Sequence, residues 1–291
     1  METNEQRILV IGAGGLIGKP VALYLRSLGH PVRVSGRNAA KLQNVFGDDF
    51  EIVQADATVP ESLAAAMEGC YGVHISLAGG YSPSTYEKIN HFAVANIARA
   101  AEEAGIQQIT HITGSTVEEE VETPFIVSKL RGENALLEGS VPATIFRASW
   151  FMETVAMMVQ KGNIMIPGRQ SNLFRFIAAD DFARMVATAF AKPTGSGIYY
   201  AYGPQTMQLK EAARIYLDAF YPQGTVKTIS LKGFTFISKF LPRGARVYAD
   251  LMNHFEVHSE PVHPGPADEI FGRNQTTLKK WIELKKGPEE E

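Results

Sequence analysis

Residues 10–18 read VIGAGGLIG, so the short apolar run ILVI at residues 8–11 passes directly into a turn with four glycines. An apolar, β-branched run of this length predicts a buried strand, and the helical spacing of apolar residues over residues 16–28 predicts a helix. The common spacing G-x-G-x-x-G fails because Ile17 occupies its third position. The spacing G-x-x-G-x-x-G fits Gly12, Gly15 and Gly18.

Each of these glycines has a physical role in a strand–turn–helix unit that binds a dinucleotide. Gly12 permits the tight turn, Gly15 lets the backbone approach a pyrophosphate, and Gly18 lets the helix pack close to the sheet. The N–H groups and positive dipole end of the helix, expected to start near residue 16, then face the phosphates. The predicted cofactor-binding turn comprises Gly12, Gly14, Gly15, Leu16, Ile17 and Gly18.

The rest of the chain alternates predicted strands and helices. Such alternation, with connections long enough for crossovers, predicts an α/β fold with a Rossmann-type, doubly wound parallel sheet. The expected strands are residues 8–11, 31–35, 51–54, 73–77, 108–113, 143–147 and 197–203. The expected helices are residues 16–28, 39–46, 62–69, 86–104 and 128–137, and residues 172–190 add one strand and one helix.

Two further segments lack this alternation and are rich in Phe, Met, Tyr and Pro. We therefore expect a dinucleotide-binding domain from residues 1–149 and 173–203. Residues 150–172 and 204–284 are expected to form a smaller C-terminal lobe for substrate or a partner, and residues 285–291 a flexible tail. Asp180 and Asp181 are read as N-cap residues of the helix that follows them.

Composition restricts the possible partners and surroundings. The 291 residues are 45% apolar and 20% charged, with a net charge of −3. A net charge this small produces no broad electrostatic field that would attract nucleic acid or a membrane. The first seven residues lack a signal-peptide core, and the single cysteine, Cys70, excludes an internal disulfide. We expect a soluble cytoplasmic protein that binds neither nucleic acid nor membrane. The sequence does not predict its oligomeric state.

The segment after the second predicted strand indicates which dinucleotide is bound. No Asp or Glu occurs from Gly29 to Gln43, where a carboxylate would accept from an NAD ribose, and Arg37 stands just past the strand. Arginine there can pair with a 2′-phosphate, which favours NADP(H) over NAD(H). A solvated loop arginine is the alternative.

Residues that follow the next two strands are further cofactor-binding candidates. Asp56, followed by Ala57, can accept from the adenine amino group, or it is only a turn residue. The small residues after the fourth strand leave room for a ribose or phosphate against the backbone; they are Ala78, Gly79 and Gly80.

Several segments in order resemble the short-chain dehydrogenase/reductase superfamily, in particular its atypical and extended branch, the NmrA-like and sugar-epimerase-like NAD(P)-binding proteins. They are the glycine turn, Asp56, NHFAVAN at residues 90–96, ITGS ending at Ser115, Lys129 and FRASWFME at residues 146–153. The likeness runs over residues 8–190, and residues 271–284 resemble the usual C-terminal ending.

The resemblance implies a catalytic Ser115 and Lys129, and it adds Thr113 and Lys129 to the cofactor-binding residues. Catalytic members of the superfamily place a tyrosine four residues before the lysine, whereas this chain has Phe125 there. NmrA-like proteins often lack this tyrosine and keep the lysine. Phenylalanine has no titratable proton, so Phe125 cannot make the proton transfer to a carbonyl that the tyrosine makes. The lysine can still hold the nicotinamide ribose, and the serine can still bind a substrate oxygen.

Four aromatic residues are candidates for the substrate pocket: Tyr81, Phe125, Trp150 and Phe151. Trp150 and Phe151 follow the sixth strand, where open α/β sheets bind ligands, or they are simple core between lobes. His254, His258 and His263 are interpreted as a surface or cleft-lining loop because Pro261 and Pro264 break any helix. A metal site is not expected there, although one histidine could be the replacement proton donor.

Two functions remain open. The first is an NADPH-dependent reductase of a small apolar acceptor, of the quinone or enone type, whose reduced oxygens can take protons from water. The second is a non-catalytic NADP(H)-sensing regulator of the NmrA-like type, with a protein partner. An isomerase or epimerase is a weaker third, because it needs the missing tyrosine.

Overall fold

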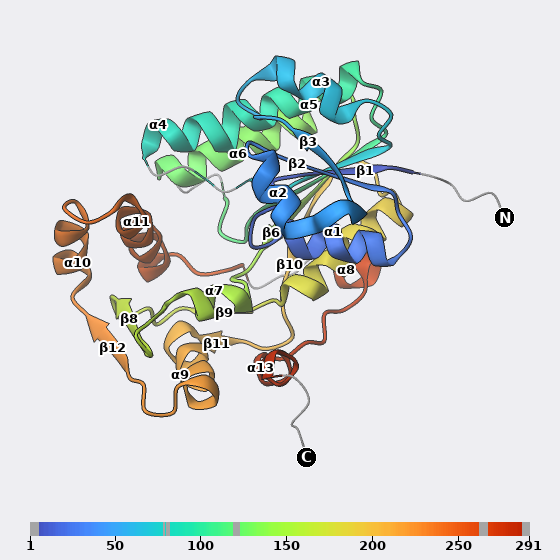
Figure 1. Ribbon diagram of the computed structural model, residues 1–291. Helices are drawn as coiled ribbons and strands as arrows, with labels where there is room; N and C mark the ends of the chain where they lie inside the picture. Colours follow the sequence, from blue (N-terminus) through green and yellow to red (C-terminus); the bar gives the residue numbers. More distant parts are fainter. Residues whose placement is uncertain (1–5, 78, 80–81, 119–122, 262–266, 287–291) are drawn as a thin grey trace.

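The structure, a computed structural model, describes residues 6–77, 79, 82–118, 123–261 and 267–286. Its centre is a seven-stranded sheet in the order β10-β6-β5-β4-β1-β2-β3, with every neighbouring pair parallel (Figure 1). The Rossmann-type fold predicted from the sequence is therefore confirmed. The strands are β1 (Ile8–Ile11), β2 (Val32–Gly36), β3 (Glu51–Gln54), β4 (Gly72–Ile75), β5 (Gln108–Gly114), β6 (Ala143–Ala148) and β10 (Gly197–Ala201).

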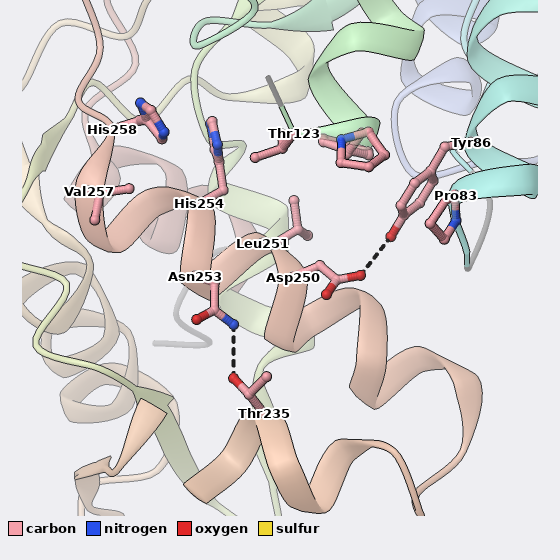
Figure 2. Close-up of a pocket in the computed structure, with 12 residues that line it drawn as sticks. Pro83, Tyr86, Thr123, Thr235, Asp250, Leu251, Asn253, His254, Val257 and His258 are labelled. Atoms are coloured by element: carbon pink, nitrogen blue, oxygen red, sulfur yellow. Dashed lines mark hydrogen bonds between the residues drawn. The ribbon is translucent and has the colours of Figure 1, made fainter. Parts of the chain in front are cut away.

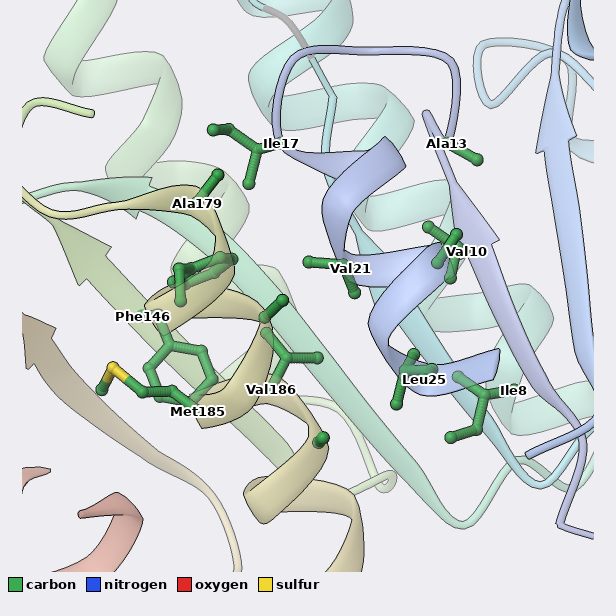
Figure 3. Packing of buried hydrophobic residues seen from close by; sticks show 14 of the residues in the cluster. Ile8, Val10, Ala13, Ile17, Val21, Leu25, Phe146, Ala179, Met185 and Val186 are labelled. Carbon is green, nitrogen blue, oxygen red and sulfur yellow. The ribbon is translucent and has the colours of Figure 1, made fainter. Parts of the chain in front are cut away.

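Helices cover both faces of this sheet, as the apolar character of β1 requires. Ile8 and Val10 point into one apolar core, and Leu9 and Ile11 into the other. A strand buried on both faces has no polar alternation, which explains the run ILVI. The first core is closed by α1 (Gly18–Ser27), α2 (Ala39–Phe46), α8 (Ala179–Ala191) and α12 (Ala267–Phe271), and Figure 3 shows residues of α1 and α8 packed there with those of β1. The second is closed by α3 (Leu63–Met67), α5 (Ala93–Glu103) and α6 (Pro124–Leu137).

The strand order places a ligand crevice at one position along the sheet. The order reverses between β1 and β4, and open α/β sheets bind ligands beyond the carboxyl ends of the strands at such a reversal. The glycine turn follows β1, so the topology brings it to this crevice.

The helix expected at residues 86–104 has a different start and an irregular middle. It begins as α4 (Pro83–Tyr86), where Ser82 and Thr85 form a capping box. It continues through a π-helical segment, η3 (Glu87–Phe92), into α5, and Gly105 follows it with φ +69°, as expected of a C-terminal glycine. The helix expected from residue 128 instead begins at Pro124, a residue type that fits a first helical turn.

The C-terminal part builds two small sheets outside the main one. The strand expected within residues 172–190 is reduced to β9 (Leu173–Phe174), which pairs antiparallel with β11 (Met207–Gln208) and does not join the main sheet. The other small sheet contains β7 (Val159–Gln160), β8 (Asn163–Pro167) and β12 (Val226–Ile229). A third apolar core joins them to α7 (Met152–Met157), α9 (Leu209–Phe220), α11 (Arg243–Val257) and α13 (Leu278–Lys286), and α10 (Leu231–Ser238) packs on α11.

The start of α8 and the end of α13 differ from the expected bounds. The N-cap of α8 is Ala178, so the reading of Asp180 and Asp181 as N-cap residues is wrong; both lie in the first turn. The Asp181 carboxylate accepts from the backbone N–H of Gln275 and of Thr276. Helix α13 continues to Lys286, so residues 285–286 of the expected tail are helical. Short 3-10 turns are η1 (Gly47–Asp49) and η2 (Pro60–Ser62). Among the described residues, no helix is long and apolar enough to cross a membrane.

Candidate functional site

A cleft of about 350 Å³ lies at the carboxyl ends of β1 to β4. It brings together six of the predicted cofactor-binding residues: Gly12, Gly14, Gly15, Arg37, Asp56 and Ala57. Leu16, Ile17 and Gly18 do not line it. The side chain of Leu16 points to solvent, Ile17 packs into the core beneath, and Gly18 begins α1.

Two positions of the turn require glycine. Gly12 has φ +79°, and a Cβ atom there would lie 2.1 Å from the backbone oxygen of Ser76, at the end of β4. A Cβ atom on Gly18 would lie 2.4 Å from the backbone oxygen of Gly12. The turn is thus pressed between β4 and α1, and Gly12, Gly14 and Gly15 line the cleft.

Arg37 and Asp56 lie on the side of the cleft formed by β2 and β3. Asp56 accepts hydrogen bonds from Thr58 N at 2.9 Å and Thr58 Oγ1 at 2.8 Å, so it forms a turn and also lines the cleft. Partial burial opposes ionisation of Asp56, but the bonds from Thr58 and the charge of Arg37 outweigh it and hold the pKa below its ordinary value. The carboxylate is therefore charged at neutral pH and near the arginine.

Phe125 and Lys129 project one turn apart from the start of α6. The Lys129 Nζ atom lies 4.9 Å from the centroid of the Phe125 ring, and the Tyr86 ring meets that ring edge-on at 5.2 Å. On the other side, a Cβ atom on Gly79 would lie 3.3 Å from Phe125 Cε2. Gly79 lies two residues after Leu77, which lines the cleft, so Phe125 lies close to the segment that borders the cleft.

The ammonium group of Lys129 lies in a half-buried position over the Phe125 ring. Among the described residues, no hydrogen bond or salt bridge to Lys129 Nζ is present. Burial lowers the pKa of Lys129 to about 8, although the charge of Glu133, one turn along α6, acts in the opposite direction. A lysine kept free in this way is available to a ligand.

This lowered pKa predicts a pH-dependent stability. Between about pH 8 and the ordinary lysine pKa of 10.5, the folded chain binds fewer protons than the unfolded chain. The free energy of unfolding therefore increases with pH in this range. Lys129→Met removes that dependence. We expect urea unfolding to show the variant more stable than the wild type at pH 7.5, by roughly 1–3 kcal/mol, with a smaller difference near pH 10.5. A difference that does not change with pH would contradict the lowered pKa.

Ser115 has a partner that the sequence did not predict. Its hydroxyl donates to Glu260 Oε1 at 2.9 Å, and Glu260 Oε2 accepts from Arg175 N at 2.9 Å. Burial raises the pKa of Glu260, which is only 7% exposed. The serine at the family's catalytic position is thus tied to a carboxyl group from the C-terminal segment.

Thr113 also serves a contact within the protein. Its hydroxyl donates to Glu133, which is fully buried and forms a salt bridge of 2.6 Å with Arg147 of β6. This buried group joins the C-terminal half of α6 to β5 and β6. The resemblance implied that Thr113 contacts a cofactor. Its hydroxyl proton is already donated to Glu133, so this proton does not serve such a contact.

Beyond Phe125 lies an apolar pocket of about 410 Å³ between α4, α6 and α11, within the range of small-ligand sites (Figure 2). Most of its exposed surface is apolar, although several lining side chains carry polar groups. The Tyr86 hydroxyl donates to Asp250 Oδ2 at 3.2 Å, and burial beside this carboxylate raises the pKa of Tyr86 to about 12. The lining residues are Pro83, Tyr86, Thr123, Pro124, Phe125, Thr235, Asp250, Leu251, Asn253, His254, Val257 and His258.

The histidines differ from the expected loop. His254 belongs to α11, its Nε2 atom lies 2.8 Å from Thr116 Oγ1, and its ring stacks on His258 at 4.5 Å. Burial, with the charges of His258 and Lys129, lowers the pKa of His254 to about 4. The ring is neutral at physiological pH, so it cannot act there as an imidazolium acid. His263 lies outside the described residues, among which no group of three metal-ligating side chains is present.

The remaining predicted site residues lie elsewhere. Trp150 packs against Phe174, Phe176 and Phe255, and Phe151 is buried against Phe182, so neither lines this pocket. Ala78, Gly80 and Tyr81 fall outside the described residues. Sequence reasoning missed Asp250, Glu133 and Glu260 because no local pattern links them to the strand ends.

Known structures share this fold over almost the whole chain. Triphenylmethane reductase of Citrobacter sp., solved with NADP(H), is 20% identical with a TM-score of 0.77, over 96% of this chain and 99% of that one. The NADPH-dependent quinone oxidoreductase QOR2 of Escherichia coli is 19% identical with a TM-score of 0.72, over 96% and 100%. At this level of identity the likeness shows the fold.

By sequence, the photosystem II assembly factor Ycf39 of Trieres chinensis is 21% identical over 203 residues, 68% of this chain. The aligned part is 64% of that protein, less than two thirds of its length. The model of the NmrA-like family matches residues 4–285. The resemblance inferred from the glycine turn, Lys129 and their neighbours is thereby confirmed, and the chain belongs to the NmrA-like family.

Proposed function

We propose that this protein is an NADP(H)-dependent reductase of a small apolar acceptor of the quinone or enone type. The observation that carries the proposal is the position of Phe125. Its ring lines the apolar pocket and approaches Gly79, two residues after Leu77 of the glycine-turn cleft, with Lys129 Nζ at 4.9 Å. An acceptor in the pocket would meet a nicotinamide at this ring.

Several features support a pyridine dinucleotide in the cleft. The glycine turn, the strand reversal and the ionised Asp56 provide sites for a pyrophosphate and an adenine. Lys129, which has no protein partner among the described residues, would hold the nicotinamide ribose. Two structures of the same fold, triphenylmethane reductase and QOR2, were solved with NADP(H) or NADPH.

The chemistry required of the protein is modest. A bound reduced nicotinamide supplies hydride, while the pocket orients the acceptor and excludes water from it. Phe125 supplies no proton, the imidazole of His254 is neutral, and the Tyr86 hydroxyl is already bonded to Asp250. A quinone fits these limits best, because its reduced oxygens take protons from water. Alcohols and simple ketones fit them worst.

The proposed 2′-phosphate contact predicts a change in cofactor preference. Arg37→Ala is expected to weaken NADPH binding by roughly tenfold to a hundredfold, because charge-assisted hydrogen bonds are lost, and to leave NADH binding almost unchanged. Calorimetric titration of both dinucleotides measures this. Arg26→Ala, at an exposed site in the last turn of α1, is the matched control. If the wild type shows no preference, or if the variant keeps it, Arg37 does not contact the phosphate.

Turnover tests the reductase itself. NADPH oxidation is followed by stopped flow against a panel of quinones, enones and aldehydes, for the wild type, Lys129→Met and the control Lys192→Met, an exposed lysine after α8. We expect quinones to turn over, and Lys129→Met to reduce the rate at least about tenfold. Tight NADPH binding without oxidation by any member of the panel would instead support an NADP(H)-sensing regulator.

A further inference from the structure

We propose that helix α10 and the start of α11 dock this protein on an anionic lipid surface. The docking surface consists of Lys232, Phe236, Ile237, Lys239, Phe240, Leu241 and Arg246, and we call it the α10 surface. The proposal concerns where the protein works and stands apart from the proposed reductase activity.

The α10 surface exposes large apolar side chains in an unusual concentration. Phe236 is 63% exposed, Ile237 53%, Phe240 78% and Leu241 44%. Single exposed apolar residues are ordinary, but four within six positions mark a contact site. The rings of Phe236 and Phe240 lie 5.7 Å apart, so the two form one apolar projection.

The helix holds these side chains outward by anchoring its opposite side. Phe234 packs edge-on against Tyr248 of α11 at 5.8 Å. Asn253 of α11 donates to Thr235 Oγ1 at 2.8 Å, a bond visible in Figure 2. Helix α10 lies at the margin of the molecule, away from the main sheet (Figure 1). The exposed rings are therefore a fixed feature of a packed helix, not a frayed end.

The segment that carries these side chains has an excess of positive charge. No Asp or Glu occurs from residue 219 to residue 249, a segment that contains Lys227, Lys232, Lys239, Arg243 and Arg246. Lys232, Phe236 and Lys239 are spaced i, i+4 and i+7, which places both ammonium groups along the side of the exposed ring. The chain's net charge of −3 conceals this local excess, which explains why composition gave no sign of attraction to a membrane.

The nearest acidic groups do not neutralise these cations. Asp250 accepts the hydrogen bond of Tyr86, and Glu256 accepts from the backbone N–H groups of Arg169 and Gln170. Among the described side chains, Lys227, Lys232, Lys239 and Arg246 form no salt bridge. Their charge is available to an external partner.

An anionic membrane fits both the apolar and the cationic side chains of the α10 surface. Aromatic and branched side chains enter the boundary between headgroups and acyl chains, and each nearby Lys or Arg adds about 1 kcal/mol with anionic lipids. A second copy of the chain fits poorly, because a two-fold interface would place the same cations opposite one another. Charge complementarity thus favours an anionic membrane over self-association.

The location also bears on the substrate. Thr235 of α10 lines the apolar pocket, so the docked helix contributes to a wall of that pocket. An acceptor dissolved in the bilayer would reach the pocket along this wall. This consequence rests on the proposed function, whereas the docking itself does not.

Flotation with lipid vesicles tests the docking. We expect the wild type to bind vesicles that contain roughly a third phosphatidylglycerol in phosphatidylcholine, to ignore pure phosphatidylcholine, and to dissociate as salt is raised. The double variants F236S/F240S and K232Q/K239Q should each lower bound protein at least about tenfold. The controls change equally exposed residues elsewhere: Leu284→Ser, and K279Q/K280Q on α13.

Three results would overturn the proposal. They are absence of binding to the anionic vesicles, equal binding by the α10 variants and the wild type, and equal loss in the α13 controls. Sedimentation that shows a dimer disrupted by F236S/F240S would assign the surface to a second copy and so also reject the lipid. NADPH oxidation with a water-soluble quinone is expected to be unchanged in the α10 variants, which separates failure of docking from failure of the reductase.

Discussion

Gly12→Ala is expected to abolish dinucleotide binding and to destabilise the fold by roughly 3 kcal/mol or more. The new methyl group would meet the Ser76 backbone oxygen at 2.1 Å, and the residue would have to keep φ +79°. Relief requires the turn to move away from β4, which carries the N–H groups out of position for a pyrophosphate. A loss of affinity of at least about a hundredfold corresponds to about 3 kcal/mol of binding.

Gly29→Ala separates strain from collision. Gly29 has a similar φ of +88°, but a Cβ atom there meets no other atom within 4 Å. This variant should lose only about 1 kcal/mol and bind cofactor normally, because the strain is present without the clash. Urea unfolding and calorimetric titration with NADPH measure both quantities. Equal NADPH affinity in Gly12→Ala and the wild type would show that the glycine turn does not bind the cofactor.

Local patterns were sufficient to predict the sheet and its glycine turn. Buried parallel strands have short apolar, β-branched sequences that can be recognised locally. Each of the seven main strands lies within two residues of its expected bounds. The G-x-x-G-x-x-G spacing reflects close contacts in the fold, because Gly12 and Gly18 are both crowded by backbone. These signals are contained within a few consecutive residues.

The apolar pocket depended on contacts that no local pattern encodes. Glu260 reaches Ser115 from 145 residues away, and Asp250 reaches Tyr86 from 164 residues away. The prolines after His258 suggested a loop, yet α11 extends to Val257, just before them. The aromatic residues after β6 carried no sign of which side they face, and Trp150 faces the C-terminal core. Side chains of this kind are found only once the chain is folded.

Loss of the buried carboxylate at Glu133 is the largest effect expected on stability. Glu133→Ala would leave the Arg147 guanidinium buried without its partner and remove the acceptor of the Thr113 hydroxyl. Breaking a buried pair on one side costs about 3–5 kcal/mol, far more than an exposed pair. Urea unfolding at neutral pH measures the loss. Glu138→Ala, an exposed glutamate just after the same helix, should change stability by less than about 0.5 kcal/mol.

The double variant E133L/R147M tests whether charge or packing causes that loss. Removing both charges and retaining apolar volume should restore most of the stability, because no unpaired ion remains. The pKa of Lys129 should nevertheless fall below its value of about 8, since the negative charge that supports its protonated form has gone. A stable double variant that binds NADPH less tightly at pH 8 than at pH 7, while the wild type changes less, would show Glu133 keeping Lys129 charged for the cofactor. Unchanged pH dependence would confine Glu133 to a structural role in joining α6 to the sheet.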